Sequence, residues 1–115
     1  MQLDVFQTLA DPSRRRIVEA LREGEQQVGD LVAKAGIHQS GVSRHLRILS
    51  DADFVSVRPD GQRRFYALKP EPFLELEDWL GQYRALWHAR LDRFEASLKN
   101  RQRQRRITRE RTTKK

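Results

Sequence analysis

The stretch from residue 39 to residue 50 combines hydrogen-bonding side chains with helical spacing. Four polar residues fall at positions i, i+3, i+4 and i+7, which share one face of a helix: Ser40, Ser43, Arg44 and Arg47. Gln39 lies beside this face at the helix start, and Val42, Leu46 and Leu49 fall on the opposite face. Hydroxyl, amide and guanidinium groups bind base edges and phosphates in the major groove of DNA. The pattern therefore predicts a helix that reads DNA, and favours this over an ordinary polar surface helix.

Further along the chain, two short runs are rich in β-branched and aromatic residues, and three arginines lie in or next to these runs. Residues 54–58 and 64–68 are typical of strands, and residues 59–63 between them contain Asp60-Gly61, a turn signal. Three cations then lie at or beside the tip of a β-hairpin: Arg58, Arg63 and Arg64. We expect them to contact DNA beside the helix, because arginine and lysine supply many of the contacts to phosphates.

Apolar residues at helical spacing predict the elements that position these side chains. Leu3, Phe6 and Leu9 indicate a short first helix, and Asp11-Pro12 is typical of the start of a second. The apolar residues that follow predict that the second helix ends near residue 23. Their helical spacing also predicts helices over residues 28–35 and 37–52. The third helix, a turn at Gly36 and the fourth helix form a helix-turn-helix unit. With the hairpin that follows, the sequence predicts a mainly α, winged helix-turn-helix fold.

A long apolar stripe predicts a last helix from about Pro70 to Leu98. Its apolar residues recur in steps of three and four, and several of them are aromatic: Phe73, Leu76, Leu80, Tyr83, Trp87, Leu91, Phe94 and Leu98. One modest core cannot cover such a stripe, and a large exposed apolar patch usually marks an interface. We therefore expect this helix to mediate association between two copies of the chain.

Charge is unevenly distributed along the 115 residues, whose net charge is +7. Residues 99–115 hold nine basic residues and one acid, Glu110, whereas residues 1–98 hold 14 basic and 15 acidic residues. We expect residues 1–98 to form the DNA-binding and dimerisation domain and residues 99–115 to form a disordered basic tail. The tail could neutralise phosphates or act only as a solubilising end.

Composition also limits the kind of site and the compartment. The chain has no cysteine, which excludes disulfides and thiolate metal sites. It has no membrane-length apolar run and does not begin with the pattern of a signal peptide, so a cytoplasmic location is expected. A glycine-rich phosphate loop, a nucleophile elbow and a complete ligand set are also missing, so we predict neither an enzyme nor a cofactor.

Three motifs, in this order, resemble ArsR/SmtB-type repressors: residues 6–17 their opening, residues 39–49 their recognition helix and residues 60–68 their wing. The resemblance implies a winged-helix repressor that binds an imperfect inverted repeat in promoter DNA as a homodimer, through its first and last helices. The residues that we assign to that dimer interface are Leu3, Phe6, Leu76, Trp79, Leu80, Tyr83 and Trp87. The chain departs from the family pattern at the helix start, where His38 replaces the usual serine cap and Gly41 lies in the first turn.

The metal sites of this family are incomplete in the sequence. Gln27 and Gly29 occupy the places of the two cysteines that bind arsenic or cadmium. The spacing of the zinc and nickel sensors falls on Glu75, Glu77, His88 and Leu91, and Leu91 cannot coordinate a metal. The chain thus resembles the cysteine-free branch that lacks the usual metal sites, and we predict no metal.

Two other readings of the function remain open at this point. One is a metal-responsive repressor that uses His88, Asp92 and Glu95, which share one helical face. The other is a nonspecific nucleic-acid-binding protein driven by the basic tail. We favour a sequence-specific regulator that binds double-stranded promoter DNA, acts as a repressor or autorepressor and leaves room for an unidentified effector.

Overall fold

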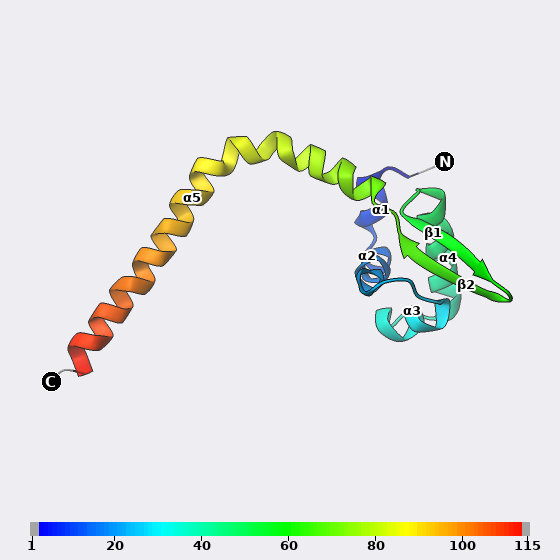
Figure 1. The fold of residues 1–115 in the computed structure, drawn as a ribbon, viewed down its shortest axis with the longest axis horizontal. Coiled ribbons are helices and arrows are strands. Elements are labelled where there is room, and N and C mark those ends of the chain that lie inside the picture. Colours follow the sequence, from blue (N-terminus) through cyan, green and yellow to red (C-terminus); the bar gives the residue numbers. More distant parts are fainter. Residues whose placement is uncertain (1–2, 114–115) are drawn as a thin grey trace. The chain divides into compact units, whose positions relative to one another are not determined.

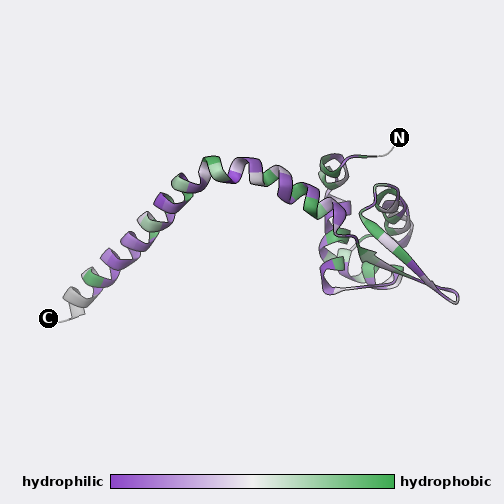
Figure 2. Cartoon of the chain, turned by 45° about the horizontal axis from the view of Figure 1, so that its top comes forward, coloured by the Kyte–Doolittle hydropathy of each residue, from purple (hydrophilic) through white to green (hydrophobic). Residues whose placement is uncertain are grey.

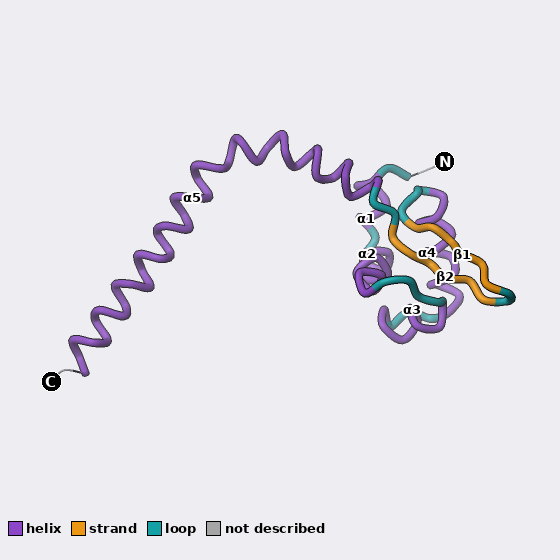
Figure 3. Tube along the Cα trace, viewed as in Figure 1, coloured by secondary structure: helices purple, strands orange, loops and turns teal. Residues whose placement is uncertain are grey.

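The computed structural model describes residues 3–113. It contains, in chain order, the following elements (Figure 1): α1 (Val5–Ala10), α2 (Pro12–Ala20), the short 3₁₀ helix η1 (Leu21–Glu23), α3 (Val28–Ala35), α4 (Gln39–Asp51), β1 (Val55–Asp60), β2 (Arg63–Leu68) and α5 (Glu71–Thr113). Two units make up the chain, of which the first ends at Glu77 and the second begins at Asp78. The predicted fold class, mainly helical with one hairpin, is confirmed (Figure 3).

Side-chain caps define where the first two helices begin. The carboxylate of Asp4 accepts a hydrogen bond from the Gln7 N–H at 2.7 Å, and the Gln7 side chain accepts one from the Asp4 N–H at 3.0 Å. Asp11 accepts bonds from the N–H groups of Ser13 and Arg14, with Pro12 at the first helical position. α1 therefore begins after Asp4, so that Leu3, which we had included in the apolar stripe of the first helix, precedes it.

The core of the first unit is formed where α2, α3 and α4 meet the base of the hairpin. Its fully buried apolar residues come from all of these elements: Ile17, Leu31, Val42, Leu46, Leu49 and Phe54. Gly36 ends α3 in the left-handed conformation, at φ 65°, as a glycine stop requires. The predicted second helix is α-helical only to Ala20, and its last turn tightens into η1. This packing fixes α4 with its apolar face inward.

The hairpin is longer than the sequence indicated. Asp60 pairs with Arg63, which leaves a two-residue turn of Gly61 and Gln62, and Gly61 has the positive φ of 64° that such turns favour. Pro59, which we had placed in the turn, lies in β1 opposite Arg64. β1 is an edge strand, where proline is tolerated. On the other side of β2, the backbone of Gln26 pairs with Tyr66 through hydrogen bonds of 3.0 and 2.8 Å.

The second unit is the part of α5 that begins at Asp78. Residues 99–113, which we expected to belong to a disordered tail, continue α5 as far as Thr113 in the structure. A physical reason is that residues 82–113 contain neither glycine nor proline and are rich in arginine, glutamine and leucine, which favour helices. Figure 2 shows polar residues dominating toward the end of α5. The tail residues Lys114 and Lys115 lie outside the described residues.

None of the helices within residues 3–113 has both the length and the apolar character required to cross a membrane.

Candidate nucleic-acid interface

α4 presents the polar face that its sequence predicted. Val42, Leu46 and Leu49 are buried in the core. The residues that we singled out for DNA binding on this helix are all exposed: Gln39, Ser40, Ser43, Arg44 and Arg47. Because α3 and the turn at Gly36 pack behind α4, this face is held on a rigid support. Such a face can enter a major groove and offer donors and acceptors to base edges.

The start of α4 is stabilised by an imidazole in place of a hydroxyl. Nδ1 of His38, at the N-cap, accepts a hydrogen bond from the Ser40 N–H at 3.3 Å and lies 2.9 Å from the Ser40 hydroxyl. Ser40 is therefore engaged in the cap, although we had predicted it as a DNA contact. Packing explains the glycine at position 41, because a Cβ there would lie only 3.0 Å from Cγ2 of Ile37. His38 and Gly41, the two departures from the family pattern, thus both belong to the start of α4.

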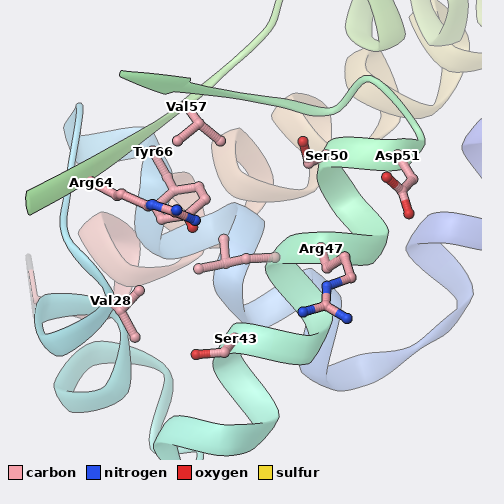
Figure 4. A pocket seen from close by; sticks show the side chains of 9 residues that line it. Val28, Ser43, Arg47, Ser50, Asp51, Val57, Arg64 and Tyr66 are labelled. Atoms are coloured by element: carbon pink, nitrogen blue, oxygen red, sulfur yellow. The ribbon is translucent and has the colours of Figure 1, made fainter. Parts of the chain in front are cut away.

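An open hollow of about 400 Å³ lies between α4 and the hairpin. Figure 4 shows its lining, which comes from α3, α4 and both strands: Val28, Ser43, Leu46, Arg47, Ser50, Asp51, Val57, Arg64 and Tyr66. Three predicted DNA contacts, Ser43, Arg47 and Arg64, are brought together here. Arg64 lies beside Tyr66 at the hollow, whereas the guanidinium of Arg47 is turned toward the other side of α4 (Figure 4). Guanidinium groups at such a surface suit the oxygens of phosphates. The other predicted contacts do not line this hollow.

Arg58 has a partner within the protein. Its guanidinium donates to the carboxylate of Glu25, with Nη2 2.7 Å from Oε1 and Nε 3.0 Å from Oε2, and it lies 4.6 Å from the centre of the Phe65 ring. These hydrogen bonds lower the pKa of the Glu25 carboxyl. Arg58 therefore joins the hairpin to the segment before α3, whereas Arg63 and Arg64 are exposed without such an ion pair among the described residues. Glu25 is 33 residues from Arg58, so no local pattern could have revealed the pair.

Comparison with known proteins places this geometry in a family. Residues 11–57 match the arsR family of bacterial regulatory proteins. Over 78 residues the chain is 40% identical to an HTH-type transcriptional regulator of Mycobacterium tuberculosis, covering 68% of this chain and 73% of that protein. The chain belongs to the ArsR family. It is also 31% identical over 77 residues to the transcriptional repressor SdpR of Bacillus subtilis, covering 67% of this chain and 86% of the repressor.

A solved structure agrees with this assignment. The crystal structure of a possible transcriptional regulator for arsenical resistance is 38% identical to the chain, with a TM-score of 0.62, and the match covers 83% of this chain and 96% of the other. Together with the exposed face of α4 and the hairpin, these similarities make the ArsR-family protein a winged helix-turn-helix, DNA-binding transcriptional regulator.

His45 is a polar residue of α4 that does not belong to the exposed polar face of this helix. Its side chain is buried, and its Nδ1 has no hydrogen-bond partner among the described residues. Burial lowers the pKa of His45, and the nearby carboxylate of Asp11 opposes this effect. The lowered pKa favours the neutral imidazole, which lies buried near Asp11 at the start of α2 in the ArsR-family protein.

The candidate metal ligands of α5 are engaged with neighbouring residues. Nε2 of His88 lies 3.2 Å from the Asp92 carboxylate, whereas Glu95 pairs with Lys99 at 3.6 Å. Among the side chains of residues 3–109, no three histidines, aspartates or glutamates are grouped so that they could hold a metal ion. At the start of α3, the Gln27 N–H donates a hydrogen bond to the Asp30 carboxylate. Gln27, which occupies the place of one of the family's cysteines, is therefore the N-cap of this helix. The reading as a metal-responsive ArsR-family protein is not favoured.

Proposed function

We propose that this ArsR-family protein is a repressor that occupies an inverted repeat in promoter DNA as a homodimer. The observation that carries the proposal is that one hollow is lined by Ser43 and Arg47 of the exposed face of α4 and by Arg64 of the hairpin. A strand of DNA backbone held there would have the recognition helix on one side and the wing on the other. Repression then follows from occupancy of the promoter, without catalysis or a cofactor, and such a protein would act in the cytoplasm.

We assign different roles to the exposed polar residues of this surface. Gln39, Ser43 and Arg44 would read bases, since an arginine can bond guanine through two hydrogen bonds and a glutamine can do so with adenine. Arg47, Arg63 and Arg64 would bind phosphates and so set the register without reading sequence. Arg58 and Ser40 would act indirectly, because the first is bonded to Glu25 and the second to the cap of α4.

Dimerisation is proposed from exposed apolar residues in each unit. In the first unit, Phe6 is 49% exposed, whereas Leu76 is half-buried against the core and so contributes less than we had predicted. In the second unit an apolar row is exposed along α5: Trp79, Leu80, Tyr83, Trp87 and Leu91. A shallow hollow of about 300 Å³ lies along this row and would receive side chains of a second copy. A two-fold dimer doubles the base contacts of one short helix.

Selection of bound sequences from a random pool of duplex DNA tests the proposal. We expect an inverted repeat whose half-sites are about one helical turn apart. On the selected site, Arg44→Ala should weaken binding by about 1–3 kcal/mol and flatten the preference at one base pair, whereas Arg63→Ala should weaken binding to all sequences similarly. A pool that yields no enriched sequence, or an Arg44→Ala protein with unchanged affinity and preference, would contradict the assignment.

A further inference from the structure

The last turns of α5 that the structure describes carry an unusual density of positive charge. Residues 99–109 form eleven consecutive helical positions, all of them exposed. Six of these positions are basic and none is acidic: Lys99, Arg101, Arg103, Arg105, Arg106 and Arg109. On a helix, Arg101, Arg105 and Arg109 form one row at i, i+4 and i+8, and Lys99, Arg103 and Arg106 form a second row about a third of a turn away. We call residues 99–109 the basic segment.

Most of these charges have no acidic partner among the side chains of residues 3–109. Lys99 pairs with Glu95 at 3.6 Å. The guanidinium groups of Arg101, Arg103, Arg105 and Arg106 make neither an ion pair nor a hydrogen bond with any side chain among residues 3–109. Like charges at i, i+4 destabilise a helix, so the basic segment is a surface whose helix an anionic partner would stabilise.

The composition of the segment favours a nucleic acid over a membrane as that partner. A helix that lies in a membrane interface needs an apolar face to insert. Ile107 is the only apolar residue among positions 99–109, and asparagine, glutamine and threonine fill the rest. Arginine binds phosphate oxygens through two parallel hydrogen bonds, and DNA offers a phosphate about every 1.7 Å along its axis.

We propose that the basic segment binds DNA phosphates outside the two half-sites, and so adds affinity that is independent of sequence. This inference rests on the proposed function, because the winged-helix domain is what brings DNA to the chain. Once that domain is bound to DNA, the basic segment is held close to the same duplex at a high effective concentration. Contacts to phosphates that are weak individually can then add to the affinity. Sequence preference would remain the task of α4.

The test replaces four arginines in one variant, R101Q/R103Q/R105Q/R106Q. Glutamine removes the charge but keeps a similar helix propensity. Affinity is measured against salt concentration on the selected operator with long flanks and on the same operator trimmed to its half-sites. On the long duplex the slope of log K against log salt should fall by up to about 0.9 for each phosphate that the variant no longer binds. On the trimmed duplex the two proteins should differ much less, and base preferences should be unchanged on both.

A matched variant without charge changes, N100A/Q102A/Q104A, controls for disturbance of the helix and should keep the slope of the unmodified protein. An unchanged slope in the arginine variant, or an equal decrease on trimmed and long operators, would overturn the proposal. So would binding of the unmodified protein to vesicles of anionic and neutral lipids that the variant loses while its DNA slope stays the same. If selection yields no operator, the slopes are measured on random duplexes of defined length, so that failure of the proposed function and failure of this inference are distinguished.

Discussion

Burial of a single imidazole should make folding depend on pH. The pKa of His45 is lowered in the folded protein, mainly by burial, whereas in the unfolded chain it is near the ordinary value of about 6.5. Below that value the unfolded chain binds a proton that the folded protein does not, so the free energy of unfolding decreases as the pH falls. In urea unfolding at about pH 7.5 and about pH 5.5, His45→Gln should therefore lose less stability on acidification than the unmodified protein does.

His88 provides the control for this prediction, because its side chain is 71% exposed on α5. His88→Gln makes the same substitution at an exposed position and controls for the exchange of imidazole for amide. The carboxylates titrate in all three proteins, so the comparison isolates the imidazole. Equal loss of stability in the unmodified protein and in His45→Gln would show that burial of His45 does not govern the acid response.

The residues of the candidate site differ in how far their roles could be predicted from the sequence. The exposed face of α4 follows from helical spacing, because burying Val42, Leu46 and Leu49 necessarily turns Ser43, Arg44 and Arg47 outward. The cap at His38 and the pairing of Arg58 could not be predicted in this way. Histidine is not among the preferred N-cap residues, and Glu25 reaches Arg58 only through the fold.

At the scale of elements, the wing is held by Arg58 and Glu25. We expect Arg58→Ala to weaken operator binding while leaving the salt slope nearly unchanged, because the charge of Arg58 is already balanced by Glu25. Arg63→Ala, on the same hairpin, should instead lower the slope by about 0.9 for each of the two copies in the dimer. Titrations of both variants against salt measure the difference. A decrease in slope as large as that of Arg63→Ala would mean that Arg58 leaves Glu25 and binds a phosphate.

The same ion pair should contribute little to the stability of the fold. Both side chains are partly exposed, at 54% for Arg58 and 36% for Glu25, and exposed pairs contribute about 0–1 kcal/mol. A double-mutant cycle of Arg58→Ala and Glu25→Ala in urea unfolding should give a coupling within that range. The pair would then position the wing rather than hold the domain together.

Elements with strong local signals were the ones that the sequence predicted well. Gly36 and the pair Asp11-Pro12 mark helix ends in the structure as they do in the sequence. The pairing of Gln26 with Tyr66 was missed, since a single bridge leaves no alternating pattern. The helix over residues 99–113 was missed because a run of like charges favours disorder, whereas the individual residues favour helix.

At the scale of the whole molecule, the proposed function requires two copies of the chain. A single α4 offers few base contacts. On α5, the side chains of Trp79, Leu80, Tyr83 and Trp87 are 42–50% exposed, and exposure of apolar surface to water is unfavourable in free energy. Association through these residues would remove that cost and bring two recognition helices to one operator. The alternative is a monomer that binds DNA through one winged helix and its basic segment.

Substitution of aspartate into the apolar row of α5 distinguishes the dimer from the monomer. Tyr83→Asp or Trp87→Asp should give monomers in sedimentation at micromolar concentration, because a carboxylate in an apolar interface loses its hydration without gaining a partner. Specific operator binding should then be lost, while weak and salt-sensitive association through the basic segment persists. Ala85→Asp is the matched control, since residue 85 lies on the opposite side of the same helix and is exposed. It should remain dimeric and bind the operator normally. A Tyr83→Asp protein that sediments as a monomer and still binds the inverted repeat at full strength would contradict the dimer.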